Sequence, residues 1–85
     1  MEHEKLLKNL IEIKSYSGEE EEMRGFIAEW FKTRRIESFN QGENLVVHLE
    51  GENRSKAFIF NAHMDTVSAG DLPWKYGPWT SVREE

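Results

Sequence analysis

The sequence predicts an α/β fold in which two amphipathic helices are followed by a β-hairpin and a core strand. Apolar residues recur at helical spacing as far as Phe31, and after Ile36 the period changes to two. Leu45, Val47 and Leu49 then alternate with Val46, His48 and Glu50. A short apolar run, Phe58–Phe60, then follows a segment of turn-forming residues, as expected for a buried strand. The 85 residues allow one small domain, residues 1–85.

The first helix is expected over Glu4–Lys14. Its apolar residues fall on one stripe, with lysines and glutamates on the opposite face. The stripe consists of Leu6, Leu7, Leu10 and Ile11. The helix is expected to end near Ser15–Tyr16.

The second helix is expected to begin with a capping box, in which Ser17 is the N-cap and Glu20 reaches back to its N–H. The acidic run Glu19–Glu22 is interpreted as complementing the positive end of the helix dipole. Arg34 and Arg35 suit the negative end. The apolar stripe is predicted to be core, and it consists of Met23, Phe26, Ile27, Trp30 and Phe31.

The strands are expected in the second half of the chain. Ser38–Asn40 and Leu45–Glu50 are strand candidates joined by a turn at Gln41–Asn44. A second turn over Gly51–Ser55 leads to the third strand, Lys56–Met64.

His63 and Asp65 are the candidate site residues. Side chains two residues apart share one face of a strand, so the two groups are expected side by side at its C-terminal end. A metal-ligating imidazole usually donates its second N–H to a carboxylate, and this spacing supplies one. The alternatives are a hydrogen-bonded histidine without a metal and an aspartate that caps a turn. His48 is expected on the solvent side of its strand, and His3 on a frayed terminus.

The composition narrows the range of partners and compartments. A formal net charge of −5 argues against nucleic acid as the main partner. No apolar stretch approaches the roughly 20 residues that cross a membrane, and the charged N-terminus is not a signal peptide. The absence of cysteine fits a reducing compartment, and a cytoplasmic location is expected.

Two stretches of the sequence resemble a known family. One runs from His63 through Val67 to Gly70-Asp71, Trp74 and Gly77-Pro78-Trp79, and the other is Ser15-Tyr16-Ser17-Gly18-Glu19-Glu20. Taken in chain order, the two stretches resemble those of the co-catalytic zinc amidohydrolases. This family includes acetylornithine deacetylase, succinyl-diaminopimelate desuccinylase, aminoacylase and glutamate carboxypeptidase. The resemblance is collinear and covers essentially the whole chain. Ser68 and Trp79 replace a proline and a phenylalanine that are common in the family, and neither position is a ligand.

The resemblance implies the start of an α/β metallohydrolase catalytic domain. It implies that His63 ligates one of two zinc ions, with cobalt or manganese as alternatives, and that Asp65 is the catalytic-site residue that orients the imidazole. The implied activity is that of a metallopeptidase or deacetylase that cleaves amide bonds of N-acyl amino acids or small peptides. No substrate-binding residue is assigned, because the aromatic residues Trp74, Tyr76 and Trp79 are interpreted as loop packing.

In the family, the bridging aspartate, the glutamate base and the remaining ligands come from later segments. The chain is therefore expected to be the N-terminal portion of such an enzyme, with one ligand of about five, and to be inactive alone. The alternative is a non-catalytic small α/β interaction module or a relic. An unpaired sheet edge also makes a homo-oligomer a candidate assembly.

Overall fold

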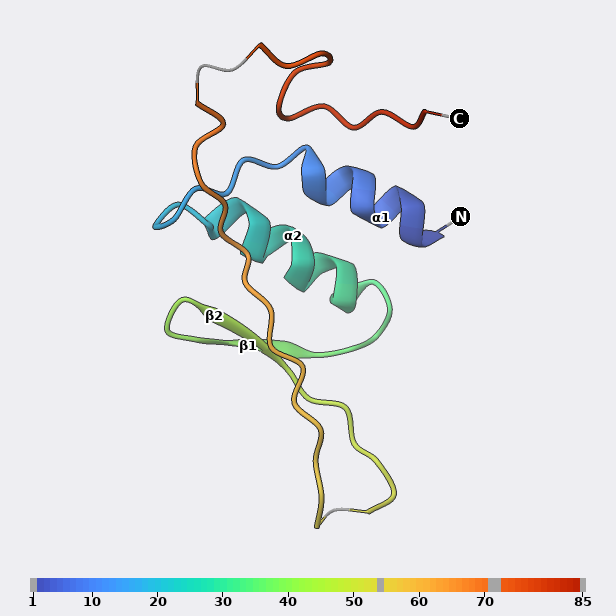
Figure 1. Ribbon diagram of the computed structural model, residues 1–85. Helices are drawn as coiled ribbons and strands as arrows, with labels where there is room; N and C mark the ends of the chain where they lie inside the picture. Colours follow the sequence, from blue (N-terminus) through green and yellow to red (C-terminus); the bar gives the residue numbers. More distant parts are fainter. Residues whose placement is uncertain (1, 54, 71–72, 85) are drawn as a thin grey trace.

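The fold consists of two helices and one β-hairpin (Figure 1). The computed structural model describes residues 2–53, 55–70 and 73–84. In chain order the elements are α1 (Glu2–Ile11), α2 (Glu21–Lys32), β1 (Ser38–Gln41) and β2 (Asn44–Val47). The mixed α/β class predicted from the sequence is confirmed, whereas the third strand is not present among the described residues.

Helix α1 begins two residues earlier and ends three residues earlier than expected. Glu2 and Glu4 lie in its first turn and Lys8 in its last, which complements the helix dipole. The apolar stripe is only partly covered: Leu6 and Leu10 are half-buried, whereas Leu7 and Ile11 are exposed.

Helix α2 begins without the predicted capping box. The N-cap residue is Glu20, and its side chain caps no helical N–H. Its Oε1 instead accepts a hydrogen bond from the Gly18 N–H at 3.0 Å. The Ser17 hydroxyl donates to the carboxylate of Asp65, at 2.6 Å. The prediction was wrong because a carboxylate distant in sequence but adjacent in space competes for the hydroxyl, and charged acceptors form the stronger hydrogen bonds.

The apolar face of α2 forms what core the molecule has, lying against both strands of the hairpin. Met23 is the only buried apolar side chain among the described residues. The other predicted core residues are half-buried, and they are Phe26, Ile27, Trp30 and Phe31. The chain leaves the helix through Arg35, whose φ of 61° is left-handed, and the Ile36 N–H then bonds to the Phe31 carbonyl at 3.0 Å.

The predicted hairpin is formed, but its second strand, expected over Leu45–Glu50, ends at Val47, and burial does not alternate along either strand. β1 and β2 pair antiparallel, with Ser38 opposite Val47 and Gln41 opposite Asn44. Gly42 has a φ of 63° in the turn, a conformation that glycine adopts without steric cost. His48 follows β2 and is exposed, as expected.

The segment predicted as the third strand, Lys56–Met64, is extended but unpaired. Figure 1 shows the chain projecting beyond the hairpin to a tip and returning past the hairpin and α2. Phe58, Ile59 and Phe60 are 95%, 90% and 97% exposed. Within the described residues, the backbone of 57–62 makes no hydrogen bond. The predicted burial was wrong because a strand apolar on both faces needs neighbouring strands and covering helices, and the described residues place none beside it. The preceding turn includes Arg54, which lies outside the described residues.

The projecting segment gives the molecule an elongated shape, with principal extents of 50 × 32 × 22 Å. Neither α1 nor α2 is long and apolar enough to cross a bilayer.

Candidate metal-ligand site

The segment that carries His63 and Asp65 is held by the loop between the two helices. Thr66 donates its N–H to the Ser15 carbonyl at 2.7 Å, and Ser17 donates its N–H to the Thr66 carbonyl at 3.3 Å. These bonds form an isolated parallel bridge between Tyr16 and Thr66. The site is therefore positioned by a short parallel pairing instead of by a third strand of the hairpin sheet.

Ser15 strengthens this pairing from inside the protein. Its side chain is fully buried, and its hydroxyl donates to the Met64 carbonyl at 2.7 Å. Its own carbonyl also accepts the Thr66 hydroxyl at 3.5 Å. The backbone on both sides of Asp65 is thus tied to a single residue of the loop between the helices.

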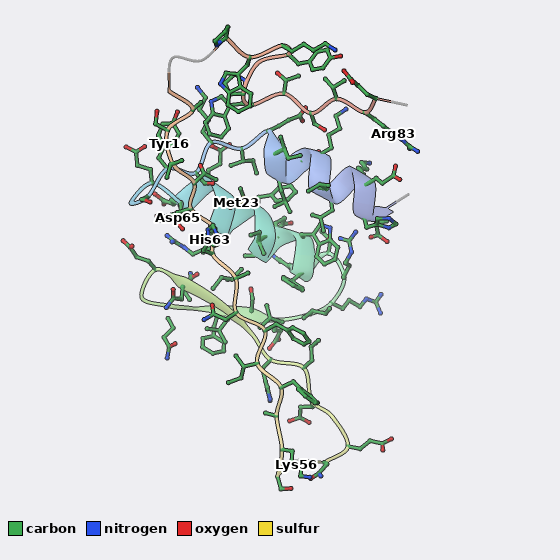
Figure 2. All side chains as sticks on the ribbon, in the orientation of Figure 1. Tyr16, Met23, Lys56, His63, Asp65 and Arg83 are labelled. Carbon is green, nitrogen blue, oxygen red and sulfur yellow. The ribbon has the colours of Figure 1, made fainter. Side chains whose placement is uncertain are left out.

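His63 and Asp65 lie side by side, as the spacing predicted (Figure 2). The Nδ1 atom of His63 lies 2.8 Å from the backbone carbonyl oxygen of Asp65 and 3.2 Å from its Oδ1. The His63 side chain is 84% exposed and that of Asp65 is 39% exposed. Both contacts engage the same ring nitrogen, so Nε2 has no partner among the described residues and faces solvent.

The second carboxylate oxygen of Asp65 is also engaged, since Oδ2 accepts the Ser17 hydroxyl at 2.6 Å. This hydrogen bond is the largest cause that lowers the pKa of Asp65 below its ordinary value. Partial desolvation opposes the shift, while the residue's own backbone N–H and the neighbouring His63 add to it. The carboxylate is therefore held in its charged form beside the imidazole.

The donor chemistry of this pair fits one ligand of a zinc site and not a whole site. A neutral imidazole with one nitrogen bound to a carboxylate and the other open is the usual state of a ligating histidine. A catalytic zinc needs about three protein ligands. Across residues 2–53, 55–70 and 73–84, no group of three histidine, cysteine, aspartate or glutamate residues is placed to hold a metal ion. The other ligands of such a site would have to come from outside the described residues.

The aromatic loop after the site packs on the protein. The rings of Tyr16 and Trp79 lie 5.5 Å apart at 59°, and the ammonium of Lys14 lies 5.9 Å from the centre of the Trp79 ring. The Trp74 indole donates to the Ala69 carbonyl at 3.4 Å. Trp79 therefore packs on the rest of the protein as predicted, whereas Trp74 and Tyr76 are 53% and 47% exposed. Asp71, part of the motif that carried the family resemblance, lies outside the described residues.

The roles of Ser15 and Ser17 were not predicted from the sequence. Their spacing contains a usable signal: residues two apart in an extended segment point the same way, so two hydroxyls can reach one neighbouring strand. From the sequence, Ser15 is instead expected at the end of the first helix and Ser17 as the N-cap of the second, a position that favours the same residue type.

In comparisons with known proteins, no family model, no curated protein and no solved structure matches the chain.

Proposed function

We propose that the chain is the N-terminal part of a cytoplasmic, zinc-dependent amidohydrolase, the start of an α/β metallohydrolase catalytic domain. In this proposal His63 ligates one of two metal ions through Nε2, and Asp65 orients the imidazole through Nδ1. The substrates are N-acyl amino acids or small peptides, and the bond that is cleaved is an amide. Bound zinc would supply a Lewis acid that polarises the amide carbonyl and activates a water molecule.

One observation supports this proposal above the others, namely the contact of His63 Nδ1 with both Asp65 Oδ1, at 3.2 Å, and the Asp65 carbonyl, at 2.8 Å. A histidine with a purely structural role does not require a carboxylate at one ring nitrogen together with solvent at the other. A ligating histidine needs both, because the carboxylate fixes the ring orientation and raises its basicity. The collinear motif around the pair points to the same chemistry.

Among the described residues, no three histidine, cysteine, aspartate or glutamate side chains are placed to hold a metal ion together. Residues 1–85 on their own are therefore proposed to be inactive and to hold zinc weakly, since one imidazole cannot replace the several fixed ligands of a tight site. The activity belongs to an assembly in which other segments bring the remaining carboxylates to the open side of His63.

The first experiment measures metal content. The isolated 85-residue chain is dialysed against metal-free buffer and analysed for zinc, cobalt and manganese. We expect no stoichiometric metal. About one tightly held zinc per monomer would overturn the proposal that the site is incomplete.

The second experiment measures activity on the polypeptide produced from the native locus. It is assayed against N-acetyl and N-succinyl amino acids and dipeptides, with and without a chelator. We expect chelator-sensitive hydrolysis that His63→Ala abolishes and that Ser68→Ala, a change in the adjacent loop, leaves intact. Hydrolysis that survives His63→Ala would overturn the assignment of His63.

A second candidate function rests on the exposed segment Phe58–Phe60, whose three side chains are at least 90% exposed. In this alternative the chain is a non-catalytic module that pairs with another copy of itself through the unpaired extended segment. Absence of any chelator-sensitive hydrolysis, together with a stable dimer of the native polypeptide, would favour this function over the hydrolase.

A further inference from the structure

The carboxylate of Asp65 has a different partner on each oxygen. Oδ1 lies 3.2 Å from His63 Nδ1, and Oδ2 accepts the hydroxyl of Ser17 at 2.6 Å. A carboxylate on an exposed chain would otherwise rotate freely about its side-chain torsions. With both oxygens engaged, one rotamer is selected, and it is the rotamer that faces the imidazole.

We propose that Ser17 is a positioning residue for the His63–Asp65 pair: its hydroxyl fixes the Asp65 carboxylate so that His63 carries its proton on Nδ1 and leaves Nε2 free. The inference deepens the proposed function and rests on it for its biological meaning. Its physical content concerns only the metal-free chain.

The backbone places Ser17 where this role requires it. The Ser17 N–H donates to the Thr66 carbonyl at 3.3 Å, and the Thr66 N–H donates to the Ser15 carbonyl at 2.7 Å. Ser17 thus directly follows Tyr16, the residue paired with Thr66, and its backbone is fixed beside Asp65. The hydroxyl therefore meets the carboxylate with little further loss of entropy. Gly18 then turns the chain away towards α2 with a φ of 85°, a backbone conformation that residues other than glycine rarely adopt.

The consequence for His63 is a choice of tautomer. A neutral imidazole carries one proton, and a nitrogen that binds a metal must be unprotonated. The acceptors near His63 Nδ1 are the carbonyl and Oδ1 of Asp65, so they stabilise a proton on Nδ1. Loss of the Ser17 hydroxyl would release the carboxylate and leave the carbonyl as the only fixed acceptor.

The test is nitrogen NMR of the histidine rings in the metal-free chain, at one alkaline pH at which the imidazoles are neutral. The ring nitrogen shifts report the ratio of the two tautomers, and His3 and His48 serve as internal references. We expect His63 to favour the Nδ1–H form relative to both references. In Ser17→Ala this ratio should fall roughly three- to tenfold, the scale of one exposed hydrogen bond.

Two further variants separate positioning from folding. Ser17→Thr keeps a hydroxyl and should retain the original tautomer ratio. Ser68→Ala removes a hydroxyl that accepts the Gly70 N–H in the same loop but does not contact Asp65, and it should change nothing at His63. The Thr66 amide signal should persist in all variants, since it reports the pairing with Ser15.

An unchanged His63 tautomer in Ser17→Ala, or a failure of Ser17→Thr to retain the original ratio, would overturn the role of Ser17. Because the measurement uses no metal and no substrate, such a result would leave the proposed hydrolase function untouched. Conversely, absence of hydrolase activity would leave the measured tautomer and its dependence on Ser17 unchanged.

Discussion

The buried hydroxyl of Ser15 donates to the backbone carbonyl of Met64 at 2.7 Å, joining residues that lie 49 positions apart in the sequence. Ser15 is the only fully buried polar residue among those that the structure describes. Its backbone carbonyl accepts the Thr66 N–H as well, so one residue holds the chain on both sides of Asp65. The position of the candidate site therefore depends on the loop between the helices as much as on the segment that contains it.

Substitution Ser15→Ala should lower the free energy of unfolding by about 1–2 kcal/mol, because it leaves the Met64 carbonyl without its donor in a partly buried place. Chemical denaturation followed by circular dichroism measures the change. The matched control is Ser68→Ala, at an exposed serine, which should stay within about 0.5 kcal/mol of the parent chain. If the two substitutions changed the free energy of unfolding equally, the buried hydrogen bond would contribute no more to stability than an exposed serine.

The features predicted correctly from the sequence are those that local interactions determine. Helix α2 and the hairpin of β1 and β2 are signalled by neighbours along the chain, and Gly42 marks the turn. The Ser17 prediction failed because a long-range contact with Asp65 competes with a local cap. The burial of Phe58–Phe60 was wrong for a related reason: an apolar run shows that a segment suits burial, but it does not supply the elements that would cover it.

The contact between His63 and Asp65 followed from their spacing, although the strand on which that prediction was based is not formed. On any extended backbone, the side chains of residues that are two positions apart point the same way. The anchoring by Ser15 and Ser17 could not be derived from spacing, because it depends on which distant segment pairs with Thr66.

The exposed apolar segment should make the isolated chain associate with itself. Residues 57–62 carry no charge, no proline and no glycine, and their backbone has no hydrogen-bond partner among the described residues. These are the properties of segments that pair edge to edge. Sedimentation velocity at several concentrations should show a mass that increases with concentration.

A charge within the segment should oppose this association, so Phe60→Lys should shift the distribution towards monomer. The matched control is Leu49→Lys, which adds the same charge at an apolar side chain that is 69% exposed outside the segment. A comparable shift by both variants would attribute the effect to net charge. A parent chain that remains monomeric at every concentration would contradict the prediction altogether.

Glu84 should titrate below the ordinary glutamate range in the folded chain. The Tyr76 hydroxyl donates to its Oε1, which is the main cause that lowers the pKa of Glu84, and the Lys75 ammonium at 3.0 Å adds to it. Because the folded pKa lies below the unfolded one, the stabilising contribution is present above the unfolded pKa and is lost as the pH falls through the folded pKa. Carbon NMR of the Glu84 carboxyl group measures the titration.

Substitution Tyr76→Phe should raise the pKa of Glu84 towards its ordinary value, because it removes the donor and keeps the ring. Lys75→Gln should raise it by a smaller amount, since the Lys75 contact is the lesser cause. A larger rise in Lys75→Gln than in Tyr76→Phe would reverse the assigned order of causes.

Helix α2 contains a glycine that the fold does not require. Gly25 lies within Glu21–Lys32 with no unusual φ, and a Cβ added there would meet nothing within 4 Å. Glycine within a helix costs roughly 0.5–1 kcal/mol relative to alanine, so Gly25→Ala should raise the free energy of unfolding by about that amount.

The hairpin offers the matched control, since Gly42 also has open space around it but a φ of 63°. Gly42→Ala should destabilise the chain by about 1 kcal/mol, the cost of a side chain in the left-handed region. Denaturation curves of the two variants measured side by side should therefore move in opposite directions, and movement in the same direction would contradict the conformations assigned to these glycines.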